Sequence, residues 1–169
     1  MRPLNANEIR GSFVNCSKGE AQRLSLPKGL ADLPWADLDF LGWRDPGAPE
    51  RGQLVAEHHG RLTGVTLRVP ANGPKGAMKT SVCSICLTPH TASGVSLQVA
   101  PRVGAAGRRG NTVGAYMCAD LACPLYVRGK KTPDLGARYQ EALTVEEQVT
   151  RALGNLEAFL DKVLDGSGG

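Results

Sequence analysis

The chain has 169 residues and a formal net charge of +4; 41% of its residues are hydrophobic and 21% are charged, with 21 glycines and 11 prolines. This length supports one domain with a substantial core, the apolar content excludes wholesale disorder, and the glycine and proline content argues against a helical bundle. No apolar run approaches the roughly 18 residues that would span a membrane, so we expect no membrane segment and no membrane partner.

Residues 1–74 are predicted to form short helices and a β-hairpin, packed as part of one domain. They begin with MRPLNANEIRGSF, which lacks the apolar centre of a secretory signal, so we expect a cytoplasmic protein. Asn7 is a candidate cap for a first helix. Ser17 with Glu20 matches the capping box of a second helix.

Two β-hairpins are expected along the chain. Residues 53–69 alternate apolar and polar side chains around a turn near His59, where we expect this histidine and the adjacent His58 to be exposed. Residues 94–103 alternate in the same way, and residues 112–118 are predicted to return beside them. The glycine- and arginine-rich residues between these two strands indicate a mobile loop.

A predicted amphipathic helix dominates residues 132–164. Thr144 and Glu147 form a capping box at its start, and apolar residues then recur at helical spacing. Because one face of this helix is apolar and the opposite face is acidic, we predict that the helix packs its apolar side on the core. The last residues, 165–169, indicate a flexible tail.

The central segment, 75–131, carries most of the positive charge. It holds eight basic residues against Asp120 alone, a net of +7, whereas the segments before and after it carry +1 and −4. An ordinary solvated surface is one explanation. The concentration of charge around the cysteines favours an anionic partner, either a nucleic acid or an acidic protein surface.

Five cysteines in a reducing compartment argue against a disulfide framework. Cys83 and Cys86 form a C-x2-C pair, and Cys118 and Cys123 form a C-x4-C pair, which together make the ligand set of a tetrahedral zinc site. Protein fills all four positions of such a site, so we predict one structural Zn²⁺ per chain. The remaining thiol, Cys16, is predicted to be a small buried hydrophobe.

The second pair requires a change of backbone conformation between its members. Residues five apart on a helix point about 140° away from each other, so Cys118 and Cys123 cannot share one helix and one ion. Pro124 suits a first helical turn, which places Cys123 at a helix start and Cys118 at a strand end. We therefore predict an α+β fold: a treble-clef zinc finger with small antiparallel β-sheets, short N-terminal helices and a long amphipathic C-terminal helix.

Other uses of these residues fit the pattern less well. The four cysteines could be buried hydrophobes with accidental spacing, and His90 could replace one of them as a ligand, although a solvated loop histidine is expected there. No grouping of serine, histidine and carboxylate resembles a triad or an acid–base pair, and no phosphate-binding loop is present. We expect no enzyme and no small-molecule substrate.

Four stretches of the chain carry a recognisable pattern: IRGSFVNCSKGEAQRL (9–24), LPWADLDFLGWRDP (33–46), SVCSICLT (81–88) and NTVGAYMCADLACPLYVRGK (111–130). They resemble the elongation-factor-G-binding family, whose treble-clef domain is shared with the FusB-type fusidic-acid resistance proteins. The resemblance extends over most of the chain. It implies that the four paired cysteines hold a structural zinc.

The resemblance also implies a partner and a role in translation. The zinc domain would bind the C-terminal domains of elongation factor G and modulate its release from the ribosome, which in the resistance proteins relieves the drug-stalled state. Those proteins carry a helical bundle ahead of this domain. Residues 1–74 are too short and too rich in β-structure to supply one, so we expect a zinc domain without it.

For contacts with the partner we select, on charge and position, six residues of the central segment: Arg108, Arg109, Tyr116, Arg128, Lys130 and Lys131. The same charges support an alternative function, a zinc module that binds ribosomal RNA, because phosphate contacts need only lysine and arginine. The chain has only eight aromatic residues, which is a thin stacking platform for a single strand.

Overall fold

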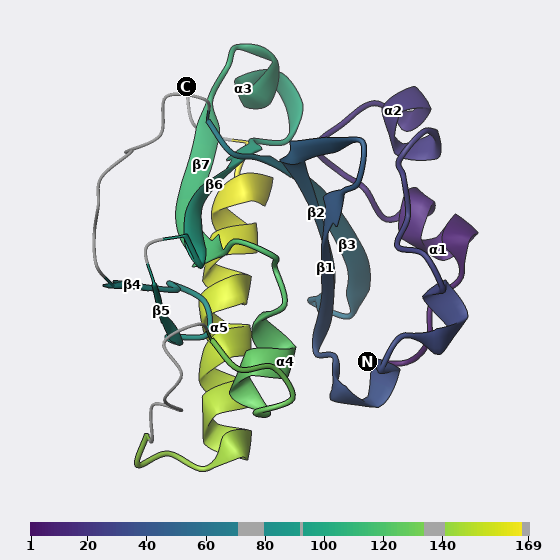
Figure 1. The fold of residues 1–169 in the computed structure, drawn as a ribbon. Coiled ribbons are helices and arrows are strands. Elements are labelled where there is room, and N and C mark those ends of the chain that lie inside the picture. The colour runs from purple at the N-terminus through teal and green to yellow at the C-terminus, as the bar shows by residue number, and fades with distance from the viewer. Residues whose placement is uncertain (71–79, 92, 134–140, 167–169) are drawn as a thin grey trace.

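A computed structural model shows a mixed α+β fold built on one five-stranded sheet (Figure 1). The structure describes residues 1–70, 80–91, 93–133 and 141–166. Its elements, in chain order, are α1 Ala6–Gly11, α2 Lys18–Gln22, the 3-10 turns η1 Leu30–Asp32 and η2 Trp35–Asp37, β1 Phe40–Asp45, β2 Ala48–His58, β3 Arg61–Arg68, β4 Thr80–Val82, β5 Pro89–Thr91, β6 Val95–Pro101, α3 Gly104–Arg108, β7 Thr112–Cys118, α4 Cys123–Val127 and α5 Val145–Leu164. The predicted fold class is confirmed.

The strands of the main sheet follow the order β1-β2-β3-β6-β7, and neighbours are antiparallel. The two predicted hairpins are confirmed as β2–β3 and β6–β7, and they join into one sheet where Arg68 pairs with Val99. The sequence analysis does not predict β1. This strand forms because the turn at Pro46-Gly47 returns the chain alongside β2. β4 and β5 make a separate two-stranded sheet.

The two faces of the main sheet bury different cores, because successive side chains of a strand point to opposite faces. Phe40 and Leu54 belong to the cluster that includes the apolar side of α5. Their neighbours Leu41 and Val55 belong to the cluster formed with the N-terminal segments. Figure 1 shows the same arrangement, with α5 on one side of β1–β3 and with α1 and α2 on the other.

The predicted C-terminal helix is confirmed as α5. The Thr144 hydroxyl accepts a hydrogen bond from the Glu147 N–H at 3.2 Å, and the Glu147 carboxylate accepts one from the Thr144 N–H at 2.8 Å. The helix buries five side chains: Ala152, Leu156, Phe159, Leu160 and Val163. Among the described residues, no helix combines the length and the apolar character needed to cross a membrane.

Three local predictions are wrong. Asn5, not Asn7, caps α1, because its side chain accepts from the N–H groups of Asn7 and Glu8 while Glu8 closes the capping box. The predicted mobile loop between β6 and β7 contains α3. His58 is buried rather than exposed, because α5 lies against it, whereas His59 is exposed as expected.

Candidate metal centre

The four paired cysteines converge on one buried point. Cys83 and Cys86 lie in the turn between β4 and β5, Cys118 ends β7, and Cys123 begins α4. None of the four exposes more than 2% of its surface. The knuckle, the strand end and the helix start therefore lie as the cysteine spacing predicts.

The spacing of the sulfur atoms matches a tetrahedral ion. The Sγ atoms of Cys83 and Cys123 lie 3.7 Å apart, those of Cys86 and Cys118 lie 3.5 Å apart, and all four lie within 4.8 Å of one another. Zinc–thiolate bonds of about 2.3 Å in a tetrahedron separate the sulfurs by about 3.8 Å, whereas a disulfide needs about 2.0 Å. The donor set and its geometry fit Zn²⁺.

Two leucines in the left-handed region shape the cysteine loops. Leu87 has φ 58° and Leu121 has φ 61°, a conformation that costs a residue with a Cβ roughly 1 kcal/mol or more. The Leu87 N–H donates to the Cys83 carbonyl, and the Leu121 N–H donates to the Cys118 carbonyl, both at 2.9 Å. Each tight turn reverses the chain, so that both cysteines of a pair can face the same point.

His90 lies against the cysteine cluster, and the prediction of a solvated loop histidine is wrong. It is 2% exposed, and its Nε2 atom lies 3.3 Å from Cys118 Sγ. Its ring meets the ring of Tyr126 edge to face, with centroids 4.7 Å apart. The short pairing of β4 with β5 turns His90 inward, and a three-residue strand leaves too weak a pattern in the sequence to find it. The geometry makes His90 a hydrogen-bonding neighbour of a ligand.

The clustered sulfur atoms shift one another's pKa values. Interactions with the neighbouring side chains of Cys118, Cys123 and Cys86 hold the pKa of Cys83 far below that of an ordinary thiol. The bonds that Cys118 and the other thiols make to Cys123, together with burial, raise the pKa of Cys123. Four neighbouring thiolates repel one another, so a cation among them is needed for all four sulfurs to be ionised.

The main sheet and α5 hold the cysteine loops in place. A Cβ added to Gly42 of β1 would lie 2.5 Å from the Leu121 carbonyl oxygen, and one added to Gly52 of β2 would lie 2.9 Å from Leu121 Cδ1. From the other side, the Asn155 side chain of α5 donates to the Ile85 carbonyl at 2.9 Å. Only glycine allows so close an approach of the sheet to the loop, and nothing in the local sequence marks these positions.

Three of the six predicted partner contacts make ion pairs inside the chain: Arg128 with Asp39, Lys130 with Asp37 and Lys131 with Asp120. Arg128 contacts both carboxylate oxygens of Asp39, one of them at 2.8 Å, and so ties α4 to the N-terminal segment. Arg102 also pairs with Asp165. At least four of the six described basic residues of segment 75–131 are thus matched by carboxylates, and Lys75 and Lys79 lie outside the described residues.

The other three predicted contacts are exposed. Arg108 and Arg109 lie on α3 and at its C-terminal end, and Tyr116 of the edge strand β7 is 46% exposed. Figure 1 shows α3 and α4 at opposite ends of the molecule. The structure therefore does not gather the six residues into one patch.

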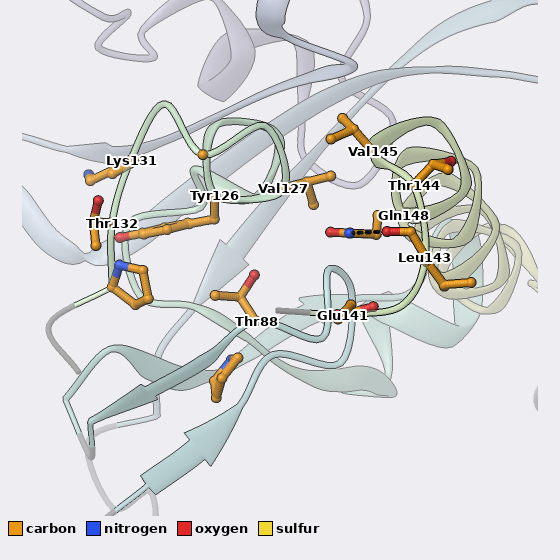
Figure 2. A pocket seen from close by; sticks show the side chains of 13 residues that line it. Thr88, Tyr126, Val127, Lys131, Thr132, Glu141, Leu143, Thr144, Val145 and Gln148 are labelled. Carbon is orange, nitrogen blue, oxygen red and sulfur yellow. Dashed lines mark hydrogen bonds between the residues drawn. The ribbon is translucent and has the colours of Figure 1, made fainter. Parts of the chain in front are cut away.

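A cavity of about 360 Å³ lies beside the cysteine cluster, between α4 and the start of α5 (Figure 2). Its lining includes Thr88, whose hydroxyl lies 3.2 Å from Cys86 Sγ, and Tyr126, whose ring contacts His90. The Tyr126 hydroxyl donates to Asp120 at 2.9 Å. The sequence analysis does not predict this hollow, because its walls come from segments far apart in the chain.

The unpaired cysteine, Cys16, lies away from the cluster and is half-buried. Burial, followed by the negative charge of Glu20, raises the pKa of its thiol. A raised pKa makes a thiol less reactive at neutral pH. The predicted full burial of Cys16 is wrong, because the structure leaves this residue half-buried.

Comparison with known proteins places the chain in a family. The sequence profile of the FBP C-terminal treble-clef zinc-finger family matches residues 8–163. A solved structure described as "Structure of the fusidic acid resistance protein FusC" is similar over 92% of this chain, with a TM-score of 0.48 and 16% identity, and the similar region spans 63% of that protein's chain. No curated protein matches the chain in sequence. On the match over residues 8–163, which includes all four clustered cysteines, the chain belongs to the FBP C-terminal treble-clef zinc-finger family.

Proposed function

We propose that Cys83, Cys86, Cys118 and Cys123 bind one Zn²⁺ and that the ion is structural. The family, the burial of the four sulfurs and their tetrahedral spacing support this. Four thiolate ligands leave no open coordination position, so the ion holds the loops together and the protein acts by binding rather than by catalysis. Metal analysis of the purified protein should find about one zinc per chain, and clearly less would contradict the proposal.

The partner we propose is elongation factor G, bound through its C-terminal domains. The observation that carries this proposal is the extent of the family match, which covers the sheet and α5 as well as the cysteine loops. The match over residues 8–163 supports carrying over to this chain the binding role that its resemblance to the elongation-factor-G-binding family implies. With this partner, we propose that the protein acts in the cytoplasm and at the ribosome.

The surface around the cysteine knuckle has the chemistry of a protein interface. Val82, just before Cys83, is 52% exposed, and Leu87, just after the first pair, is 36% exposed. The backbone of Tyr116 lies beside the knuckle, because its carbonyl accepts a hydrogen bond from the Ser84 N–H at 2.7 Å, and the Tyr116 side chain is itself exposed. Such an apolar centre suits a protein partner. The internal ion pairs of the basic residues leave less free positive charge for ribosomal RNA, which favours a protein over the nucleic-acid alternative.

The test is a calorimetric titration of the zinc-loaded protein into purified elongation factor G, at low and at physiological salt. We expect saturable one-to-one binding that weakens modestly with salt, because an apolar interface depends little on charge. A parallel titration with ribosomal RNA should show weak binding with a steep salt dependence. Absence of binding to the factor at both salt concentrations would contradict the proposal.

Variants locate the contact surface. Leu87→Gly removes an exposed side chain at a position where glycine adopts the left-handed conformation without strain, so folding is preserved. Combined with Tyr116→Ala, it should weaken binding to the factor at least about tenfold, as the loss of central apolar contacts does. Unchanged affinity would remove the knuckle surface from the proposal.

The basic contacts are tested separately. Charge reversal at Arg108, Arg109 and Lys130 should weaken binding if these residues face acidic groups of the factor. Lys28→Glu, exposed in the N-terminal segment, is the matched control because it changes the net charge without touching α3 or α4. If the triple reversal lowers the binding free energy by no more than three times the change caused by Lys28→Glu, the basic residues are not contacts.

We further propose that binding modulates release of elongation factor G from the ribosome and so gives tolerance to fusidic acid. Expression of the chain in a susceptible bacterium should raise the inhibitory concentration of the drug. The Leu87→Gly, Tyr116→Ala variant should not raise it. An unchanged inhibitory concentration, in cells where the chain demonstrably binds the factor, would separate binding from tolerance and contradict this part of the proposal.

A further inference from the structure

Two histidines and two carboxylates meet where the tip of the β2–β3 hairpin lies against α5. The Nε2 atoms of His58 and His59 lie 2.8 Å and 3.3 Å from the same atom, Asp161 Oδ1. These three potential ligand atoms lie within 4.8 Å of one another. The other ring nitrogen of His59, Nδ1, lies 3.4 Å from Glu157 Oε1. None of these residues has a part in the cysteine cluster or in the proposed binding surface.

We propose that His58, His59 and Asp161 form a second metal site, which binds a divalent transition-metal ion of the zinc class. Tetrahedral bonds of about 2.0 Å to nitrogen and oxygen separate the ligand atoms by about 3.3 Å. The two separations of 2.8 Å and 3.3 Å at Asp161 Oδ1 are close to this value, so small side-chain movements admit an ion. Three protein ligands leave a position for water, and the ion exchanges more readily than one held by four thiolates.

The backbone at the hairpin tip directs both imidazoles toward α5. His59 and Gly60 have φ values of 49° and 73°, as in a two-residue hairpin turn for which Asn-Gly is the favoured pair. A histidine in the first position is more strained than glycine would be, which points to a use for its side chain. Adjacent residues of a regular strand point to opposite faces, but this turn brings the two rings to a centroid distance of 4.1 Å.

Neighbouring residues orient the two imidazole rings and leave the site open to solvent. Glu157 is placed to accept a hydrogen bond from Nδ1–H of His59, which leaves the Nε2 lone pair free for a metal, an arrangement common around zinc. His58 is only 7% exposed, so packing orients its ring. The side chains of His59 and Asp161 are 65% and 53% exposed, so an ion can enter from solvent.

The donor set defines the class of ion. Imidazole nitrogen suits zinc, copper and nickel, whereas calcium and magnesium take oxygen ligands. We therefore expect a response to Zn²⁺ and none to Mg²⁺. A bound ion would crosslink the hairpin tip to the C-terminal half of α5, so its binding should also stabilise the fold.

The experiment begins with protein that carries one tightly bound zinc and titrates it calorimetrically with further Zn²⁺, and with Mg²⁺ in parallel. A second, weaker equivalent of Zn²⁺ is expected, together with a midpoint of thermal unfolding that rises with Zn²⁺ concentration.

His59→Asn removes a ligand but keeps a favoured turn residue, and it should weaken the second site more than about tenfold. Glu157→Gln should weaken it by about tenfold or more. Glu146→Gln, at the opposite end of α5, is the matched control and should have no effect.

Three results would overturn the proposal. One is the absence of a second equivalent in the unaltered protein at millimolar Zn²⁺. Another is a His59→Asn variant that binds the second equivalent as tightly as the Glu146→Gln control. The third comes from cobalt substitution: a second equivalent of Co²⁺ that adds thiolate charge-transfer bands would belong to the cysteines, because imidazole and carboxylate ligands produce none.

Discussion

Gly42 and Gly52 allow the sheet to pass directly beneath the loop between Cys118 and Cys123. At Gly42, an added Cβ would lie 2.5 Å from the carbonyl oxygen and 2.7 Å from the Cβ of Leu121. Both neighbours are close to the loop backbone, so they cannot swing away as the end of a long side chain can. The loop between Cys118 and Cys123 therefore packs on the sheet where Leu121 meets Gly42 and Gly52.

This contact leads to a prediction about Gly42→Ala. The added methyl group forces the loop away from the sheet, and the free energy of unfolding of the zinc-loaded protein should fall by about 1–3 kcal/mol. Urea denaturation followed by circular dichroism measures the change. Gly11→Ala is the control, because a Cβ there meets nothing within 4 Å. Equal stability of the two variants would show that the loop relaxes freely.

His90 leads to a second prediction at the scale of one residue. Its Nε2 atom lies 3.3 Å from Cys118 Sγ, where an N–H donor stabilises a metal-bound thiolate. His90→Ala should weaken zinc binding by about 10–100-fold while all four cysteines remain. Competition with a chromophoric chelator measures the affinity, and His59→Asn is the control. If His90→Ala binds zinc as tightly as the unaltered protein, His90 only packs against the cluster and does not stabilise the thiolate.

At the scale of elements, α5 contributes in two ways. Its apolar side covers the sheet, and Asn155 reaches the cysteine knuckle through the Ile85 carbonyl. The capping box of Thr144 and Glu147 begins the helix, yet Gly154 lies exposed in its middle, where it weakens the helix. The helix therefore relies on tertiary packing more than on its own propensity.

Gly154→Ala tests this view of α5. A Cβ at Gly154 would meet nothing within 4 Å, so alanine fits without strain. The substitution should raise the free energy of unfolding by about 0.5–1 kcal/mol, because glycine loses more backbone entropy on folding. Urea denaturation gives the value, and partner affinity should stay unchanged. A loss of stability would mean that α5 needs flexibility at this position.

At the scale of the molecule, the cysteine cluster and the sheet share one core. The four cysteines belong to the same buried cluster as the β2 and β3 side chains and the apolar side of α5. Arg128 and Asp39 add a bridge from α4 to the N-terminal segment. Loss of the ion should therefore disturb elements beyond the cysteine loops.

Removal of the proposed zinc gives a prediction at this scale. Treatment with a strong chelator, or Cys118→Ser, should unfold the region of α4 and the β4–β5 sheet, because metal binding of this kind contributes on the order of 10 kcal/mol to folding. Loss of amide signal dispersion in NMR spectra measures the effect. Cys16→Ser, outside the cluster, is the matched control and should keep both its zinc and its fold. A folded, zinc-free Cys118→Ser protein would contradict the structural role.

The sequence by itself determined the features that depend on residues close together in the chain. The capping boxes of Ser17 with Glu20 and Thr144 with Glu147, both hairpins and the two cysteine pairs follow from spacings of a few residues. Helical periodicity identified Leu156, Leu160 and Val163 on the buried side of α5, but it missed the burial of Ala152 and Phe159. Strand periodicity identified the alternation in the strands. The cysteine spacing indicated a four-thiolate site, and Pro124 with the flanking strand pattern indicated the strand end and helix start of a treble clef.

Only the tertiary structure decided which distant segments meet. Arg128 and Asp39 are 89 residues apart, and His58 and Asp161 are 103 apart, yet each pair is in hydrogen-bond contact. A charge count over segment 75–131 therefore overstated the charge available to a partner, and a turn position wrongly suggested an exposed His58. The physical reason is that periodicity and capping report local backbone geometry, whereas burial and ion pairing depend on contacts that only the folded chain makes.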